Sequence, residues 1–142
     1  MDETHDPTHV LSTDEAWAFL RSCTFGRLAY HVAAEVDIAP VNYVATADGL
    51  VFRTAPGSKL FGVTAGKTVA FEVDEVDVDS ATSVVARGIA RHLTGPAADA
   101  ADTLPLHPWV LTEKLEVVAV QVTEISGRRF DLHRPEGTGP AA

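Results

Sequence analysis

Cysteine and positive charge are the scarce features of this chain of 142 residues. The single cysteine, Cys23, excludes a disulfide within the chain, and one isolated thiol fits a reducing compartment. The chain has eleven lysines and arginines and 20 aspartates and glutamates, which gives a net charge of −9. Because nucleic-acid binding needs clustered cations, this balance argues against nucleic acid as a partner. A small anionic ligand stays possible, since it needs only a local positive site.

Long apolar runs are missing as well. No run of about 18 apolar residues occurs, which argues against a membrane-spanning helix. The acidic N-terminus lacks the basic-then-apolar order of a signal peptide. We therefore expect a cytoplasmic protein with no membrane partner.

Familiar catalytic and metal-binding motifs are also absent. The chain contains no nucleophile elbow, no Walker loop and no dinucleotide-binding glycine motif. Its histidines are dispersed and have no cysteine set beside them: His5, His9, His31, His92, His107 and His133. We expect no metal site and no side-chain nucleophile. Cys23 is expected to be a buried structural thiol on the apolar face of a helix.

The regular structure predicted from the pattern is mainly β, with flanking helices. A capping box at Ser12 and Glu15, followed by apolar residues at helical spacing, predicts a helix over residues 13–22. Alternating apolar residues and turn signals predict six strands, over residues 25–30, 36–45, 50–54, 68–73, 83–92 and 116–126. Short strands with hairpin-like connections favour an antiparallel barrel, although periodicity does not identify which barrel.

The domain organisation predicted from the chain is simple. Residues 11–133 are expected to form a single domain, between a flexible N-terminus over 1–10 and a disordered tail over 134–142. Within the domain, we expect a solvated acidic loop over 74–80 and a partly helical connection over 96–106. Pro40 predicts an edge or bulge position in the second strand.

The segment from Leu50 to Leu60 carries the clearest functional signal. An apolar strand ends in Arg53 and Thr54, a Pro-Gly turn follows, and Ser58 and Lys59 begin a short helix. Two cations and two hydroxyls beside helix-start N–H groups are a plausible phosphate site. The alternative is an ordinary helix start, with Ser58 as its cap and Lys59 in solvent, and with Arg53 as a surface charge.

The order of the motifs resembles one known family. Gly-Arg-Leu, Pro-Val-Asn-Tyr, Phe-Arg-Thr, Ser-Lys, Phe-Glu-Val and Val-Val-Ala-Arg-Gly follow one another between about residues 11 and 129. This succession is similar to the flavin-binding split-barrel relatives of pyridoxamine 5′-phosphate oxidase, and closest to their short bacterial members. The resemblance implies a six-stranded antiparallel split β-barrel that binds FMN at a homodimer interface.

The resemblance also implies which residues hold the cofactor. Four match the residues that hold the flavin phosphate: Arg53, Thr54, Ser58 and Lys59. Three match the strand whose backbone lies along the flavin ring: Val41, Asn42 and Tyr43, the last of which could equally be a core residue. Three more are weaker candidates for closing the site of a partner subunit: Trp109, Arg128 and Arg129.

The function implied by the resemblance is that of an FMN-dependent oxidoreductase acting on a small molecule. After the serine, the oxidase proper has Arg-Lys where this chain has Lys59-Leu60. We therefore expect a relative of the oxidase, and not oxidation of pyridoxamine phosphate itself. The alternatives are a deazaflavin-dependent reductase of the same fold, a flavin- or small-ligand-binding protein without turnover, and a dimeric scaffold whose cofactor site has decayed.

Overall fold

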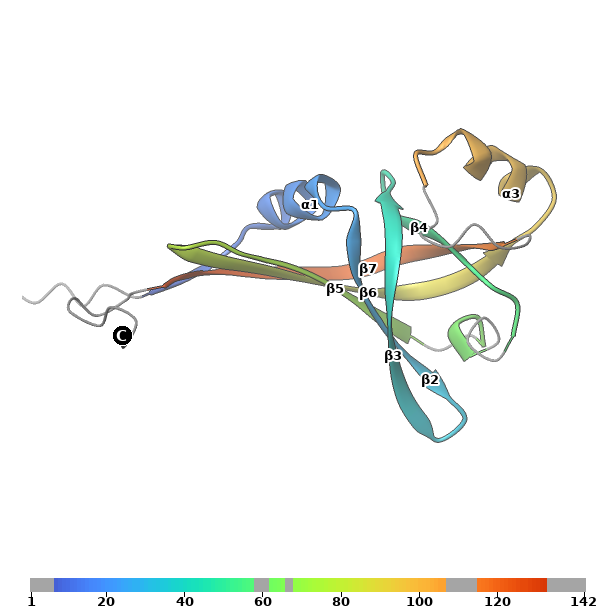
Figure 1. Ribbon diagram of the computed structural model, residues 1–142, viewed down its shortest axis with the longest axis horizontal. Coiled ribbons are helices and arrows are strands. Elements are labelled where there is room, and N and C mark those ends of the chain that lie inside the picture. The colour runs from blue at the N-terminus through green and yellow to red at the C-terminus, as the bar shows by residue number, and fades with distance from the viewer. Residues whose placement is uncertain (1–6, 58–61, 66–67, 107–114, 133–142) are drawn as a thin grey trace, which may run out of the picture.

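The computed structural model describes residues 7–57, 62–65, 68–106 and 115–132. This part of the chain is mainly β and carries a few short helices (Figure 1). The helical elements are α1 (Thr13–Ser22), α3 (Pro96–Ala100) and the 3₁₀ helix η1 (Ala101–Thr103). The strands are β1 (Thr8–Val10), β2 (Phe25–Val32), β3 (Glu35–Ala45), β4 (Gly49–Thr54), β5 (Thr68–Val76), β6 (Ser80–Leu93) and β7 (Glu116–Asp131).

Six of these strands close into a barrel. Hydrogen-bonded neighbours follow the order β7-β4-β3-β2-β5-β6, and β6 pairs again with β7, so the ring is complete. Every pairing is antiparallel. The predicted six-stranded antiparallel barrel is therefore confirmed. The additional strand, β1, pairs with the far end of β7 outside the ring.

The interior of the barrel is filled by apolar side chains. Cross-strand partners share a face of the sheet, so the alternation along each strand sends one set of residues inward. The largest fully buried side chains are Tyr43, Phe52, Phe71, Leu20, Leu28, Leu50, Val63, Val73, Val84, Val118 and Val120. This set forms a packed core, and candidate ligand-binding side chains have to be sought on the outer face.

Helix α1 begins at the predicted capping box. The Ser12 hydroxyl accepts from the Glu15 amide at 3.1 Å, and the Glu15 carboxylate accepts from the Ser12 amide at 2.8 Å. Two orphan donors of the first turn are thereby satisfied. The buried face of the helix, with Ala16 and Leu20, joins the barrel core. Burial raises the pKa of the Cys23 thiol at the C-cap, which disfavours the nucleophilic thiolate.

Several boundaries differ from the sequence prediction, and the following three differ in the same way. Residues 8–10 form β1, where a flexible segment was expected, because Thr8 pairs with Phe130 and Val10 with Arg128. The acidic stretch after residue 73 continues β5 to Val76, so the predicted loop shortens to a turn before Ser80. Strand β7 extends to Asp131 and not only to residue 126. In each case, pairing with a neighbouring strand of the sheet overrides a polar local composition.

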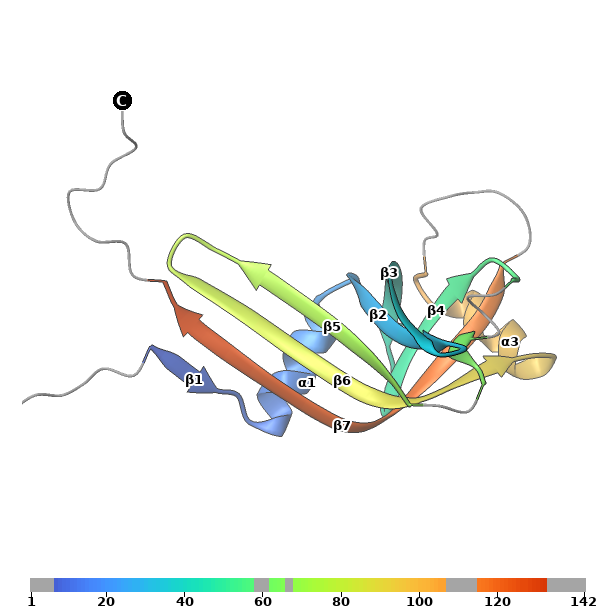
Figure 2. The same cartoon turned by 90° about the horizontal axis from the view of Figure 1, so that it is seen from below.

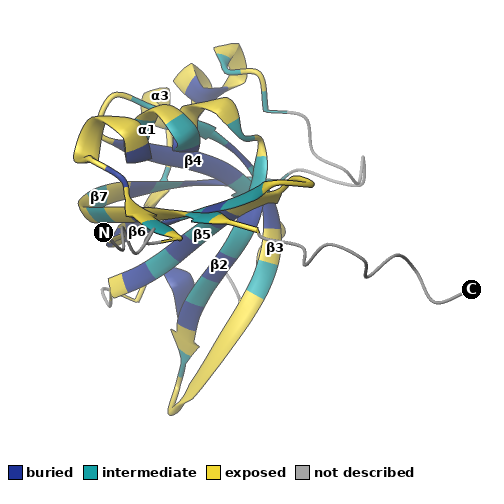
Figure 3. Cartoon of the chain, turned by 90° about the vertical axis from the view of Figure 1, so that its left-hand side faces the viewer, coloured by how far each residue is buried: buried dark blue, intermediate teal, exposed yellow. Residues whose placement is uncertain are grey.

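Two hairpins extend beyond the closed ring. In Figure 2 the hairpin of β5 and β6 runs alongside β7 toward one end of the molecule, where β1 lies. In Figure 1 the hairpin of β2 and β3 projects away from the remaining strands. Figure 3 marks the end of this second hairpin as exposed. Val36 and Ile38 lie there, with 70% and 63% of their surfaces exposed.

Candidate functional site

Five of the ten predicted cofactor residues lie at a fork between β3 and β4: Val41, Asn42, Tyr43, Arg53 and Thr54. These strands pair only from Tyr43–Phe52 to Ala45–Leu50, and beyond Tyr43 they separate. Asn42 and Arg53 are the next residues on each strand, so they border the opening. From Glu35 to Asn42, β3 keeps only β2 as a paired strand in the described part of the chain. The edge position predicted for Pro40 is therefore confirmed.

The inward face of the fork belongs to the core. Val41 and Tyr43 are buried in the apolar cluster, and the Tyr43 ring meets Phe71 edge-on with ring centroids 4.6 Å apart. The Tyr43 hydroxyl donates to the backbone carbonyl of Leu20 in α1. These two side chains are therefore core residues, and only their backbone is available to a ligand. The side chain of Asn42 alternates to the opposite, outer face.

Arg53 projects from the outer face toward the segment that follows β6. Its Nη2 donates to Asp102 Oδ1 at 2.7 Å, and 21% of its side chain is exposed. Asp102 lies in η1, nearly fifty residues further along the chain, and no sequence pattern marks it as a partner of Arg53. The structure therefore adds a carboxylate to the candidate site that sequence reasoning missed.

Thr54 follows Arg53 in β4 and is buried on the opposite side of the strand. The two side chains therefore do not share a face of β4, and the chain beyond them turns through Pro56 and Gly57. Gly57 has a φ of 145°, which side-chain-bearing residues rarely adopt, and a Cβ there would meet no atom of the described residues within 4 Å. Within the described part of the chain, the turn therefore leaves space beside the two predicted phosphate contacts.

The two C-terminal arginines do not share a face. Arg128 and Arg129 are consecutive in β7, and they pair with Ser83 and Thr82 respectively. Arg129 Nε donates to the Thr82 hydroxyl at 3.3 Å, whereas Arg128 projects to the other side. Arg53 pairs with Val117 near the opposite end of β7, so neither arginine reaches the fork of its own chain.

Three predicted cofactor residues lie outside the described part of the chain: Ser58, Lys59 and Trp109. The segments that carry them join described elements at the fork. Residues 58–61 follow the Gly57 turn, and residues 107–114 connect the end of the segment after β6 with the start of β7. The assignments of these residues stay predictions from the resemblance.

A charged cluster on the outer face is a second feature that the sequence did not single out. Arg27 Nη1 lies 2.8 Å from Glu72 Oε1 and 3.2 Å from Asp74 Oδ2. Two carboxylates share one guanidinium here, because β2 pairs with β5 so that Arg27 faces Glu72. Burial, together with the hydrogen bond and repulsion from Asp74, raises the pKa of Glu72 to about 7 in spite of Arg27.

This cluster makes a pH-dependent contribution to stability. Between the ordinary carboxyl pKa of 4.5 and about 7, the folded chain binds a proton at Glu72 that the unfolded chain has released. The free energy of unfolding is therefore expected to fall as the pH rises through this window. Urea denaturation at several pH values tests this: Glu72→Gln is expected to flatten the dependence, and an unchanged slope would contradict the assignment.

A further polar pair lies near the end of β4. His92 Nε2 is 2.9 Å from Glu116 Oε2, and Glu116 pairs across the sheet with Thr54. The pair thus links β6 to β7 beside the strand end that carries a predicted phosphate contact. Only the sheet register brings these residues together, since they lie far apart in sequence and match no local motif.

Comparison with known proteins agrees with this architecture. The family model described as pyridoxamine 5′-phosphate oxidase matches residues 12–129, which is most of the chain. The chain belongs to this family. The resemblance seen in the order of the sequence motifs is therefore confirmed, and the closed barrel is the split barrel of these proteins.

Solved structures of family relatives cover nearly the same length. A protein of Corynebacterium glutamicum, provisionally named pyridoxamine 5′-phosphate oxidase, is 37% identical over 93% of this chain and 99% of its own, with a TM-score of 0.82. The FAD-binding protein of Mycobacterium smegmatis is 36% identical over 88% of this chain and 100% of its own, with a TM-score of 0.75. An uncharacterized protein of Mycobacterium tuberculosis is 33% identical, and the match covers 84% of each chain.

One observation bears on membranes. Among the residues that the structure describes, no helix combines the length and apolar character needed to cross a bilayer.

Proposed function

We propose that the protein binds FMN at the fork between β3 and β4 and uses it to oxidise or reduce a small molecule. The observation that carries this proposal is the position of Asn42 and Arg53, one on each strand, at the end of the β3–β4 ladder. A strand edge that pairs with only one strand in the described part of the chain, beside a cation, suits a planar ring that carries a phosphate. The family relationship supports a flavin in general, since one relative is a FAD-binding protein. FMN and FAD share the flavin and its first phosphate.

The residues present fit such a group. Arg53 supplies guanidinium donors to the phosphate, and the Gly57 turn leaves room for it beside the hydroxyl of Thr54. Ser58 and Lys59 add the remaining phosphate contacts in this proposal. The backbone of residues 41–43 orients the ring in this proposal, because the side chains of Val41 and Tyr43 are buried in the core and do not face the site. The bound flavin supplies hydride or electron transfer, and the protein supplies position and charge.

The first experiment is an absorption spectrum of the purified protein, before and after addition of excess FMN and removal of unbound ligand. We expect retained flavin at about one per chain, because the phosphate and the ring are held by separate segments. A retained deazaflavin spectrum would favour the deazaflavin alternative. No retained chromophore would contradict a flavin site. Preference for FAD over FMN would correct the cofactor within the same proposal.

Turnover is tested separately from binding. Oxidation of a reduced nicotinamide by the flavin-loaded protein, above the rate with free flavin, is the expected result for an oxidoreductase. Retained flavin without such turnover would favour a flavin-binding protein with no catalytic role. We place the activity in the cytoplasm, as an acidic chain with one cysteine suits a reducing compartment.

The proposal includes a homodimer with the cofactor at the interface. Val36 and Ile38 share one face of β3 and are mostly exposed. Exposed apolar side chains add little stability to an isolated subunit, and their clustering is typical of an interface. Arg128 also projects from the outer face and cannot reach the fork of its own chain. A second subunit would cover the apolar residues and bring its Arg128 to the cofactor. Arg129, on the other side of β7, is not expected to reach the same cofactor.

The double substitution Val36→Lys and Ile38→Lys tests the interface. Light scattering is expected to give a dimer for the unmodified protein and a monomer for the variant, because four like charges would face one another in the assembled pair. Flavin retention is expected to fall together with the dimer. A variant that stays dimeric, or that loses the dimer while keeping full flavin affinity, would contradict this interface.

A further inference from the structure

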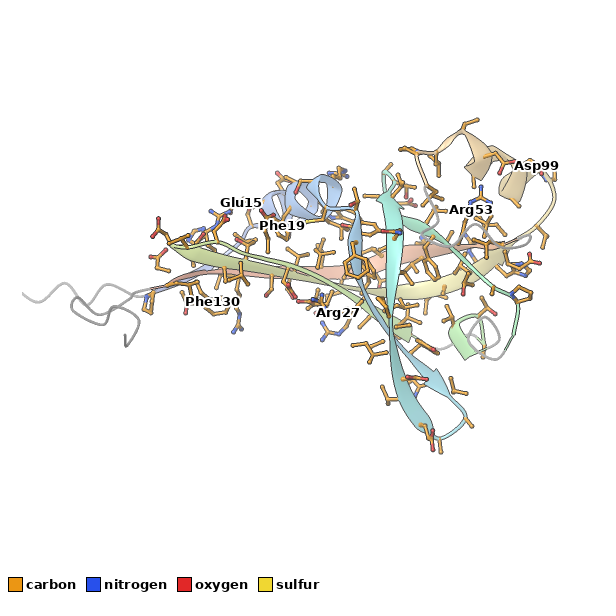
Figure 4. The ribbon with its side chains drawn as sticks, viewed as in Figure 1. Glu15, Phe19, Arg27, Arg53, Asp99 and Phe130 are labelled. Atoms are coloured by element: carbon orange, nitrogen blue, oxygen red, sulfur yellow. The ribbon has the colours of Figure 1, made fainter. Side chains whose placement is uncertain are left out.

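The segment after β6 covers the outer side of the strand that carries Arg53. Residues 96–106, which we call the strap, comprise α3, η1 and the chain up to Leu106. Their apolar side chains pack against Val51 of β4 and Val117 of β7; on the strap these are Ala98, Ala101, Leu104 and Leu106. In Figure 4 the Arg53 side chain points toward the strap, near the labelled Asp99. The position of the strap is thus set by an apolar contact of its own.

Asp102 is the strap residue that meets the guanidinium. The ion pair is 2.7 Å long, yet the two side chains differ in environment, with 21% of Arg53 and 69% of Asp102 exposed. The arginine is therefore confined between the sheet and the strap, while the carboxylate reaches it from the solvent side. A guanidinium carries five N–H donors, and the Asp102 oxygen accepts from Nη2, so one carboxylate does not exhaust the donors.

We propose that Asp102 is a positioning residue, which holds the Arg53 guanidinium in the orientation that binds the flavin phosphate. The inference rests on the flavin site proposed above. A carboxylate beside a phosphate also repels it, but water around the exposed Asp102 screens that repulsion. A preorganised guanidinium loses less conformational entropy on binding than a mobile one. The net effect of Asp102 on phosphate binding is therefore favourable.

The test separates the phosphate from the rest of the cofactor. Dissociation constants for FMN and for riboflavin, which lacks the phosphate, are measured by fluorescence quenching with the full chain. Asp102→Ala is expected to weaken FMN binding about tenfold, the scale of one charge-assisted hydrogen bond, and to leave riboflavin binding unchanged. Asp102→Asn keeps an oxygen acceptor and is expected to stay within about twofold of the unmodified protein.

Asp99→Ala is the matched control, because it removes one carboxylate from the same strap and is expected to leave both affinities unchanged. Equal weakening of FMN and riboflavin by Asp102→Ala would overturn the inference, since it would indicate a general structural role. Tighter FMN binding by either Asp102 variant would overturn it in favour of competition between carboxylate and phosphate. If the unmodified protein bound neither flavin, the proposed function itself would fail. If only the inference failed, the unmodified protein would bind FMN and Asp102→Ala would not change its FMN affinity.

Discussion

Arg53→Ala is expected to weaken FMN binding by roughly 10- to 100-fold, the largest effect of a single substitution outside the core. Hydrogen bonds from a guanidinium to an anion contribute about 1.5–3 kcal/mol, which corresponds to this range. The effect is large here because Arg53 is mostly buried beneath the strap, so water replaces its contacts poorly. The measurement is an FMN titration at fixed ionic strength, with riboflavin titrated in parallel.

The phosphate contact has two distinguishing signatures. Riboflavin binding is expected to be nearly insensitive to Arg53→Ala, and FMN binding by the unmodified protein is expected to weaken with salt more than FMN binding by the variant. Arg21→Ala is the matched control, because it removes one cation from α1 and its guanidinium contacts Ala47 in the β3–β4 turn, at the other end of the ladder from the fork. Unchanged FMN affinity in Arg53→Ala would refute the phosphate assignment for this residue.

Phe71→Ala is expected to lower the free energy of unfolding by about 3–5 kcal/mol, because it opens a cavity in the middle of the barrel. Phe71 is fully buried, its ring packs edge-on against Tyr43, and its Cζ lies 2.5 Å from where a Cβ on Gly26 would be. Contacts on several sides leave little freedom for the core to collapse into the vacancy. Against a typical total of about 5–15 kcal/mol, such a loss removes a large fraction of the stability.

Tyr43→Phe separates the polar contribution of this core from its packing. The substitution keeps the ring but removes the hydroxyl that donates to the Leu20 carbonyl, so a loss of about 1–3 kcal/mol is expected. Urea denaturation followed by tryptophan fluorescence measures both variants. Val76→Ala, at an exposed position on the same strand as Phe71, is the control and is expected to change stability by less than about 0.5 kcal/mol. Similar losses in Phe71→Ala and this control would contradict the packing described.

Local signals predicted several elements closely. The capping box fixes the start of α1 because both of its hydrogen bonds join residues three apart. The turn between the strands predicted over 36–45 and 50–54 joins β3 to β4, with the Thr46 amide donating to the Gly49 carbonyl. The inward face of β3, with Val41 and Tyr43, follows from the period of two. Each of these features depends on residues close together in the chain.

Other features depend on which distant strands become neighbours. Strand β1 exists because it pairs with the far end of β7, although its composition predicts a flexible end. Arg53 and Thr54 are predicted to hold one phosphate together, and the structure places their side chains on opposite sides of β4, so the strand end is where they are proposed to share it. Arg128 and Arg129 separate in the same way. The sequence already indicates that consecutive residues of a strand point to opposite faces. Whether a face is buried or exposed depends on which other elements cover it.

The sequence by itself determined the class of the fold, the first helix, the hairpin of β3 and β4, and the family. Its motifs are local, and their order along the chain is enough to identify a family. Tertiary structure alone decided the closure between β6 and β7, the fork beyond Tyr43, the pair of Arg53 with Asp102 and the shared guanidinium of Arg27. These contacts join residues far apart in the chain, and their geometry follows from sheet register and burial, which no short pattern of residues records.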